Sequence, residues 1–485
     1  MVHFLLLVHV VYLFITFPAV IQSAKEPQTV LLVSMDGMPW NLISGKFADT
    51  PNLDRVAKKG VKANYITTVV PGKTWPTHQS MLTGLYPENH GIVSNTFWDP
   101  VYKEKFILEY DCSNFDPKFY NESEPIWLTL QRSTTNRGRS GVYFWPGFGG
   151  YKEMPSFYRK PICKLNCSAV DPKELPNLRK NTRTSWPPYE HCYPDFFNET
   201  ETFSKRVDRV IGWLKSDDPP RFVALYIDAP DWKGHSDGAL SQPYKDSIEE
   251  VDRDAVGYLL DHLEEESLDD KVNVIFVSDH NMVNTSSERV ILLDEYIDPS
   301  TYTLTESGSV GHMWPKEGML EEIYKNLTQP NTPDHLTVYK RQDIPEDYHW
   351  KHNRRIPPIY LDPDVGWVVK TSNASVRPGH WVKGDHGWPP QKAKSYSILF
   401  AQGPAFKVGY EIEPFSIVDL YPMMCDLLGI EPRPNNGSMA IVKKMYKDTG
   451  DKEDEGPTAG QRNVVTWSLG ALLPLAVFSV FLGSF

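Results

Sequence analysis

Acidic and imidazole side chains follow three apolar runs of the chain, and a further histidine lies in a glycine-rich loop. These residues are Asp36, Asp231, His235, Asp279, His280 and His386. The C-terminal ends of parallel strands meet at one edge of a sheet, so side chains far apart in the sequence can converge there. Their convergence would create a site for two metal ions.

Each signal has an ordinary structural alternative when it is taken alone. Asp36 before Gly37 is typical of a turn, and Asp279-His280 is also compatible with an Asx turn beside a surface histidine. Asp231 and His235 are four residues apart, which places both on one face of a helical turn, either as metal ligands or as a surface ion pair. The joint occurrence of these residues is what favours the metal site.

Thr74 is a candidate nucleophile. It lies in residues 71–78, Pro-Gly-Lys-Thr-Trp-Pro-Thr-His, just before a helical pattern. A hydroxyl at a helix N-terminus meets free backbone N–H groups and a favourable dipole, which suits an alkoxide that attacks a phosphate. The alternative is an ordinary threonine N-cap.

The elements that must position these residues follow an α/β pattern. Apolar runs rich in β-branched residues alternate with helical patterns, which predicts a central, mostly parallel sheet with helices on both faces. The expected strands are residues 29–34, 141–145, 222–227, 272–278 and 395–401, and the expected helices are 52–59, 77–83, 202–214, 244–266, 319–327 and 416–428. Residues 112–200 and 331–385 are expected to be loop-rich cap insertions that shape the substrate site.

The two ends of the chain predict export and membrane attachment. Residues 1–24 resemble a secretory signal peptide, 25–435 would form the catalytic domain, and 436–462 would form a polar stalk. Residues 463–485 are nearly all apolar and fit either a single-pass anchor or a lipid-anchor signal. We therefore expect a protein of the cell membrane whose catalytic part is extracellular.

Glycosylation signals, cysteines and charge agree with this location. Seven Asn-x-Ser/Thr sequons predict N-linked glycans, at Asn121, Asn166, Asn198, Asn284, Asn326, Asn373 and Asn436. Four clustered cysteines suggest two disulfides with three possible pairings, namely Cys112, Cys163, Cys167 and Cys192, while Cys425 is expected to be a buried apolar residue. The net charge of −12 argues against a stable nucleic-acid partner.

Taken in order, these residues resemble the alkaline phosphatase superfamily and, more closely, the ectonucleotide pyrophosphatase/phosphodiesterase family. The likeness extends over about residues 29–434. It rests on residues 34–37, the Thr74 segment, 83–92, 145–147, 230–235, 278–280 and 403–406. The chain is similar to a short, membrane-anchored form without somatomedin-B-like and nuclease-like domains. Asn281 stands where the family has a glycine.

The resemblance implies an alkaline phosphatase-like fold and two Zn²⁺ ions bridged by the substrate phosphate. Asp231, His235 and His386 would hold one ion, and Asp36, Asp279, His280 and the Thr74 oxygen the other. Mixed carboxylate and imidazole ligands suit zinc better than calcium or magnesium, although manganese and cobalt stay open. Thr74 would form a phosphothreonine intermediate, and Asn95 would donate a hydrogen bond to a phosphate oxygen.

The expected substrates are extracellular nucleotides, dinucleotides or NAD, cleaved to nucleoside 5′-monophosphates. Trp75 would stack on the base from one side, and Tyr189 or Tyr193 from the other. One alternative is a choline-phospholipid phosphodiesterase on the same scaffold, and another is an inactive binding ectodomain. A phosphomonoesterase would need an extra cationic group, and Lys73 beside Thr74 is expected to face solvent.

Overall fold

An eight-stranded sheet forms the centre of the protein. The computed structural model describes residues 28–107, 112–159, 201–329, 333–372 and 382–447. The strand order is β20 (Tyr410–Ile412), β2 (Val61–Ala63), β19 (Leu399–Gln402), β9 (Val272–Val277), β1 (Thr29–Met35), β8 (Phe222–Ile227), β6 (Ser140–Tyr143) and β7 (Phe157–Arg159). Strands β9, β1, β8, β6 and β7 run parallel, and β19 is antiparallel to both of its neighbours. The expectation of a mostly parallel sheet is confirmed.

The three central strands are apolar because both of their faces are covered. Every residue of β8 and β9 is buried, as are residues 30–35 of β1. Strands of this kind lack the alternation of polar and apolar residues that is seen in half-exposed sheets. Their ends match the expected ranges within one residue, because an uninterrupted apolar run bounded by polar residues is a clear signal.

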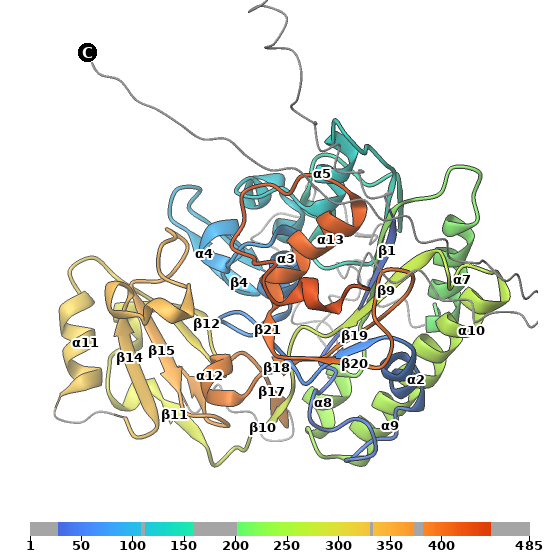
Figure 1. Ribbon diagram of the computed structural model, residues 1–485. Coiled ribbons are helices and arrows are strands. Elements are labelled where there is room, and N and C mark those ends of the chain that lie inside the picture. The colour runs from blue at the N-terminus through green and yellow to red at the C-terminus, as the bar shows by residue number, and fades with distance from the viewer. Residues whose placement is uncertain (1–27, 108–111, 160–200, 330–332, 373–381, 448–485) are drawn as a thin grey trace, which may run out of the picture. The chain divides into compact units, whose positions relative to one another are not determined.

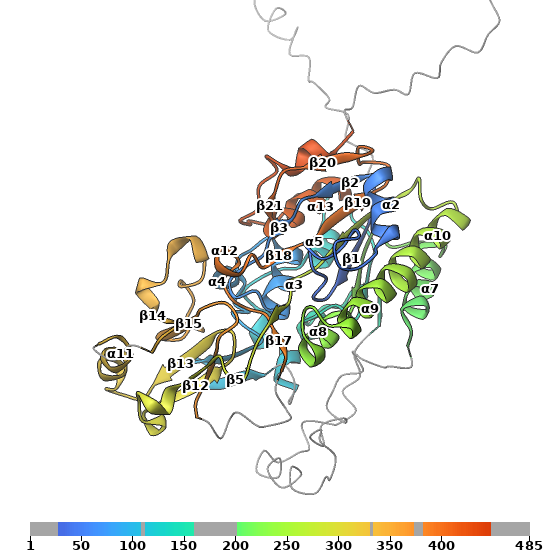
Figure 2. The ribbon, with the colours of Figure 1, turned by 90° about the horizontal axis from the view of Figure 1, so that it is seen from below.

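Helices cover both faces of this sheet (Figures 1 and 2). On one side lie α2 (Pro51–Lys59), α7 (Phe203–Leu214), α9 (Gln242–Val251) and α10 (Tyr258–Glu265); on the other lie α3 (Thr74–Thr83), α5 (Ile126–Arg132) and α13 (Leu420–Leu428). The single helix expected over residues 244–266 is instead α9 and α10 joined by a π-helical segment, Asp252–Gly257. In that segment the Asp252 carboxylate accepts the backbone N–H groups of Asn52 and Leu53 at the start of α2, at 3.0 and 2.9 Å.

A second, antiparallel sheet lies beside the first, in yellow and orange in Figure 1. Its strand order is β12 (Tyr302–Glu306), β13 (Gly311–Pro315), β15 (Ile359–Pro363) and β14 (Leu336–Lys340). Together with α11 (Leu320–Thr328) it encloses a smaller apolar cluster of its own. We call residues 302–363 the antiparallel lobe. The segment 331–385, expected to be rich in loops, thus contributes β14, β15 and also β16 (Val368–Lys370).

Short elements connect the sheets and carry parts of the site. They are β3 (Ile66–Thr67), α4 (Pro87–His90), β4 (Thr96–Asp99), β5 (Glu104–Ile107), α8 (Asp231–Asp237), β10 (Val283–Asn284), β11 (Val290–Leu292), β17 (Gly384–Asp385), α12 (Pro390–Ala393), β18 (Tyr396–Ser397) and β21 (Phe415–Ser416). Strand β17 pairs with β10, and β4 pairs with β5.

The expected signal peptide, most of the cysteine-rich insertion and the apolar C-terminal stretch lie outside the described residues. Among the residues that are described, no helix has the length and apolar character needed to span a bilayer. Cys425 on α13 is a buried free thiol, as expected, and burial raises its pKa.

Candidate active site

The expected metal ligands converge at the C-terminal edge of the central sheet. Asp36 directly follows β1, Asp279 and His280 follow β9, and α8 begins with Asp231 after β8. Strand β1 lies between β8 and β9, so these chain segments are neighbours. The side chains form two groups, Asp36–Asp279–His280 and Asp231–His235–His386, and in each group one ligand atom per residue lies within 4.8 Å of the others.

The first group is almost fully buried. His280 Nε2 lies 3.2 Å from Asp36 Oδ1 and 3.0 Å from Asp279 Oδ2. The Thr74 hydroxyl lies 3.4 Å from the same nitrogen. The candidate nucleophile therefore adjoins this group.

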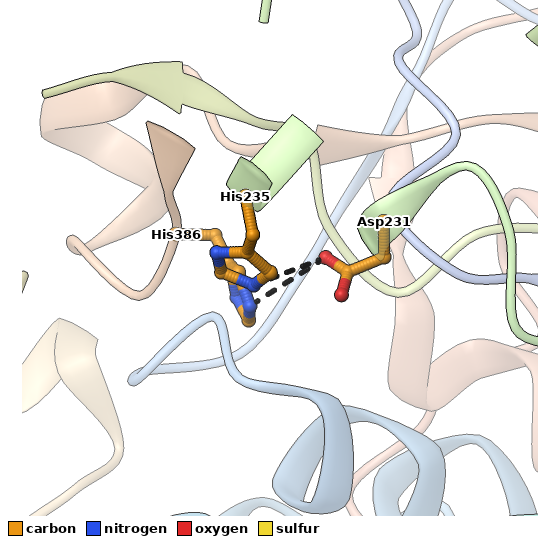
Figure 3. A group of neighbouring side chains, drawn as sticks. All are labelled: Asp231, His235 and His386. Atoms are coloured by element: carbon orange, nitrogen blue, oxygen red, sulfur yellow. Dashed lines mark ion pairs between the residues drawn. The ribbon is translucent and has the colours of Figure 1, made fainter. Parts of the chain in front are cut away.

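The second group is formed by a helical turn and a loop (Figure 3). Asp231 and His235 lie one turn apart on α8, with His235 Nε2 3.4 Å from Asp231 Oδ1. His386, which follows β17, brings its Nε2 to 3.8 Å from the same oxygen. Its ring also stacks on that of His280, with the ring centroids 3.3 Å apart, so the two groups are adjacent.

Backbone carbonyl groups fix the orientation of all three histidine rings. Nδ1 contacts the carbonyl oxygen of Gly384 for His235, of Gly72 for His386 and of Asn281 for His280, at 2.8, 2.8 and 3.1 Å. A carbonyl oxygen can only accept a hydrogen bond, so each Nδ1 carries the proton. Each Nε2 then faces the site, the arrangement that metal-binding histidines usually show.

The carboxylates leave matching oxygens without donors. Asp36 Oδ1, Asp231 Oδ1 and Asp279 Oδ2 are buried and accept no hydrogen bond from the described part of the chain. The second oxygen of Asp36 accepts from the Tyr226 hydroxyl, and that of Asp279 accepts from the Gly37 N–H at 3.0 Å. Buried acceptors that face one another are costly unless a cation lies between them. The donor set therefore fits metal ions.

The pKa shifts have the same cause. Burial raises the pKa of Asp231 to about 6, and burial together with Asp279 raises that of Asp36. Burial opposes charge on His280, but the carboxylates of Asp279 and Asp36 outweigh it and raise the pKa of His280 well above its usual value. The pocket is thus an electronegative one that bound cations would neutralise.

Gly37 allows the two groups to approach each other. Its φ of +67° is in the left-handed region, and a Cβ at this position would lie 2.9 Å from the Asp231 Cα. The backbone is further joined by a 3.0 Å hydrogen bond from the Asp231 N–H to the Asp36 carbonyl. Only glycine combines this conformation with this contact.

Thr74 is the first residue of α3, three residues before the expected start of the helix. Its hydroxyl is therefore at a helix N-terminus, where free N–H groups and the helix dipole stabilise negative charge. His78, one turn later, donates from Nδ1 to the Thr74 carbonyl at 2.7 Å, and its Nε2 lies 2.9 Å from the Ser34 hydroxyl. His78 was not among the expected site residues, although it lies four residues after Thr74, one helical turn away.

Asn95 is held beside the candidate nucleophile. Its Oδ1 accepts the backbone N–H of Trp75 at 2.9 Å. Because a backbone N–H can only donate, the carbonyl oxygen of the Asn95 amide must face Trp75. The NH₂ group of Asn95 is then the part that remains to donate to a ligand.

The expectation that Lys73 faces solvent is wrong. Its side chain is buried, and Nζ lies 3.1 Å from Asp385 Oδ1. The same carboxylate accepts the N–H groups of His386 at 2.8 Å and Ser309 at 3.1 Å. Lys73 and Asp385 therefore connect the chain before Thr74 with the loop that carries His386.

The residues expected to bind the base are only partly described. Trp75, on the first turn of α3, is 7% exposed, while Tyr189 and Tyr193 lie outside the described residues. The stacking of these aromatic side chains on a base stays a prediction.

Asn281, which replaces a family glycine, has no positive φ, and its amide donates to the Lys394 carbonyl at 3.2 Å. The loop beside His280 therefore accommodates asparagine without left-handed backbone.

Comparisons with known proteins agree with this geometry. The sequence model of the family described as Type I phosphodiesterase / nucleotide pyrophosphatase matches residues 30–389. The chain belongs to this family. It is similar to ectonucleotide pyrophosphatase/phosphodiesterase family member 5 of Homo sapiens, with 35% identity over 420 residues that cover 87% of this chain and 78% of that protein.

Other relatives extend the comparison. Bis(5′-adenosyl)-triphosphatase ENPP4 of Homo sapiens is 34% identical over 88% of this chain and 83% of that protein. Family member 7 of Mus musculus is 35% identical over 89% of this chain and 90% of that protein. The solved structure of murine ENPP5, as an inactive threonine-to-alanine variant in complex with AMP, has a TM-score of 0.74 at 34% identity and covers 87% of this chain and all of that chain. The α/β fold expected from the sequence is confirmed, and the protein is a hydrolase of the nucleotide pyrophosphatase/phosphodiesterase family.

Proposed function

We propose that this protein is a zinc-dependent phosphodiesterase that hydrolyses nucleotides, dinucleotides or NAD to nucleoside 5′-monophosphates. The observation that carries the proposal is the Thr74 hydroxyl at the N-terminus of α3, 3.4 Å from His280 Nε2 and next to two groups of carboxylate and imidazole side chains. Asp36, Asp279, His280 and Thr74 would hold one Zn²⁺, and Asp231, His235 and His386 the other. Mixed nitrogen and oxygen donors favour zinc over magnesium or calcium.

The residues of the chain divide the reaction between them. When bound, the two ions would stabilise charge on the attacking and leaving oxygens and lower the pKa of a coordinated hydroxyl group. The Thr74 hydroxyl gives up its proton to solvent and its Oγ1 attacks phosphorus. The bond from phosphorus to the leaving oxygen breaks, and that oxygen departs with the electron pair and takes up a proton from water. Water then attacks the phosphothreonine, which releases the nucleoside 5′-monophosphate and restores the hydroxyl. Asn95 donates its NH₂ group to a phosphate oxygen whose charge grows in the transition state.

Two relatives support a nucleotide substrate. One carries the name bis(5′-adenosyl)-triphosphatase, and another was solved with AMP. In this chain Trp75 would offer an indole edge or face to the base, with Tyr189 or Tyr193 opposite. A choline-phospholipid substrate on the same scaffold stays the competing assignment, because aromatic side chains can also enclose a quaternary ammonium group.

We further propose that the protein acts at the cell surface. The support is the apolar stretch at residues 1–24, the apolar segment at 463–485 and the sequons. Four sequon asparagines lie on the surface of the described structure, namely Asn121, Asn284, Asn326 and Asn436, where glycans would have room. Treating the purified protein with an N-glycosidase and measuring the change in mass tests this point.

The nucleophile is tested by Thr74→Ala. Thr83→Ala is the matched control, because Thr83 lies at the other end of α3 and its hydroxyl donates to the Gln79 carbonyl at 2.7 Å. We expect Thr74→Ala to lose activity by at least about 1,000-fold, since removing a nucleophile abolishes the covalent route. The Thr83→Ala variant should stay close to wild type. Full activity of Thr74→Ala would contradict the assigned role.

The substrate and the metal are tested together with a panel. Purified protein is assayed on a diadenosine polyphosphate, NAD, a nucleotide ester and a phosphocholine ester, before and after chelation and with zinc added back. Hydrolysis of the nucleotide compounds that disappears on chelation and returns with zinc supports the proposal. Hydrolysis of the phosphocholine ester alone would assign the protein to the competing substrate class, and activity resistant to chelation would exclude the metal mechanism.

A further inference from the structure

Glu306 of the antiparallel lobe reaches the loop that carries Asn95. Its Oε2 accepts the hydroxyl of Ser94 at 2.9 Å and the backbone N–H of Thr96 at 3.1 Å. One carboxylate oxygen thus binds the two residues on either side of Asn95. Ser94 is fully buried, and Glu306 is itself only partly exposed.

A β-bulge directs Glu306 towards this loop. Strand β12 pairs in register with β13 at Leu304 and Met313, and the register then shifts so that Glu306 faces His312. A bulge bends its strand and redirects the side chains that follow, and such irregularities are frequent next to active sites. Without the extra residue, the alternation of side chains along β12 would turn Glu306 to the opposite face of the strand.

The loop is held on its other side by the nucleophile helix. Asn95 Oδ1 accepts from the Trp75 N–H on α3, as described above. A neighbouring contact comes from the Trp350 indole, which donates to the Val93 carbonyl at 2.9 Å. Residues 93–96 are therefore attached to the antiparallel lobe by three hydrogen bonds, two at backbone groups and one at the Ser94 hydroxyl, while the Asn95 side chain is attached to α3.

We propose that Glu306 is a positioning residue that holds the NH₂ group of Asn95 against the substrate phosphate. This inference rests on the proposed function, because it concerns the phosphate that Asn95 would bind. Glu306 acts through the loop and does not touch the phosphate. Its charge is directed at two donors of the chain, and a carboxylate facing the phosphate directly would repel it.

The size of the effect follows from what misalignment costs. Loss of one transition-state hydrogen-bond donor lowers kcat by about 100-fold or more. Displacing a group by about 1 Å can cost on the order of 100-fold. Removing Glu306 leaves Asn95 present but removes the hydrogen bonds to Ser94 and Thr96 on either side of it, so we expect Glu306→Ala to lower kcat by about 10- to 100-fold. The KM for the diester should change less, because the metal-binding groups stay in place.

The test is a double-mutant cycle in the full-length protein with a diadenosine polyphosphate as substrate. The variants are Glu306→Ala, Asn95→Ala and their combination. If Glu306 acts through Asn95, the double variant should be no slower than Asn95→Ala alone. Glu306→Gln keeps an oxygen that can accept both donors and should recover most of the rate. Glu317→Ala is the matched control, since Glu317 is an exposed glutamate of the same lobe.

Two further measurements separate positioning from a general loss of structure. Ser94→Ala removes one of the two hydrogen bonds and should give a smaller loss of kcat that also vanishes in the Asn95→Ala background. Amide hydrogen exchange should become faster at residues 93–96 in Glu306→Ala, without change in the central strands. The Ser94→Ala measurement holds even where the alanine variant at Glu306 is too unstable to assay.

The outcomes are distinct. A Glu306→Ala variant that keeps the wild-type rate, or rate losses that multiply in the double variant, would overturn the inference. An inactive wild-type protein on every phosphodiester would instead overturn the proposed function, and the exchange measurement would still report whether Glu306 orders the loop. Equal losses in Glu306→Gln and Glu306→Ala would show that the charge matters and not the hydrogen bonds, which also contradicts the positioning role.

Discussion

Replacing Gly37 by alanine should move apart the two groups of candidate metal ligands. The added Cβ would lie 2.9 Å from the Asp231 Cα, 3.0 Å from its Cβ and 3.2 Å from its Oδ1. Carbon atoms in contact are ordinarily about 3.5 Å apart or more, so Asp231 must move by roughly 0.6 Å away from Asp36. A shift of this size at a reacting centre is expected to lower kcat by about 10- to 100-fold.

The backbone conformation is a separate cost that a control removes. At a φ of +67°, alanine is less stable than glycine by about 1–2 kcal/mol. Gly45 has a similar φ of +77°, but its added Cβ would come no closer than 3.7 Å to a neighbouring atom, the Oδ1 of Asp49. Gly45→Ala should therefore show the same backbone strain without displacing a ligand.

The assay measures zinc binding by equilibrium dialysis, diesterase rate and thermal unfolding for both variants. We expect both to be destabilised to a similar degree, and only Gly37→Ala to lose zinc affinity and rate. If the two variants retain equal zinc affinity and equal rate, the close contact between Gly37 and Asp231 does not control the site.

Further predictions concern two buried acids. Tyr226→Phe removes the hydroxyl that donates to Asp36 Oδ2. We expect the affinity for zinc, measured by dialysis, to fall by about 10- to 100-fold. An unchanged affinity would show that the hydroxyl does not orient Asp36. Asp99→Asn removes one charge of the fully buried Asp99–Arg355 pair and should lower the free energy of unfolding at pH 7 by about 3 kcal/mol, measured with urea. Burial opposes the charge of Asp99, but hydrogen bonds from Arg355 and Arg354 outweigh it and lower its pKa, so its contribution is present at neutral pH and is lost as the pH falls below about 4. The stability difference between wild type and Asp99→Asn should therefore shrink in acid, and a difference that does not depend on pH would contradict this account.

Local signals were sufficient for the buried strands β1, β8 and β9 of the central sheet, but not for its short strands β2, β7 and β20 or for the antiparallel lobe. Strands β1, β8 and β9 are continuous apolar runs, and such runs identify buried parallel strands without knowledge of their partners. Strand β14 is short and only partly buried, and it is stabilised by pairing with β15, which begins about twenty residues later. Its neighbourhood is rich in proline, which favours loops, so the pairing could not be inferred from the sequence alone.

At the site, the candidate residues could be predicted from the sequence, but the hydrogen-bond partners that orient them could not. The convergence of Asp36, Asp279 and His280 follows from the position of each residue at a strand end, and the resemblance to a family gave the order of the ligands. The carbonyl partners of the histidine rings depend on tertiary contacts of the backbone, for which side-chain identity carries no signal. Lys73 is buried for the same reason, since its partner Asp385 lies more than three hundred residues away.

Support for the chemistry comes from both sheets of the protein. Glu306 and Trp350 of the antiparallel lobe hold the segment around Asn95, and Ser309 contacts both Asp385 and the His386 carbonyl. A shortened protein that lacks residues 302–363 would thus keep Thr74, but the contacts that hold the Asn95 segment and the His386 loop in position would be lost. A design that moves these site residues to another scaffold must therefore include the antiparallel lobe, because that lobe holds their loops in position.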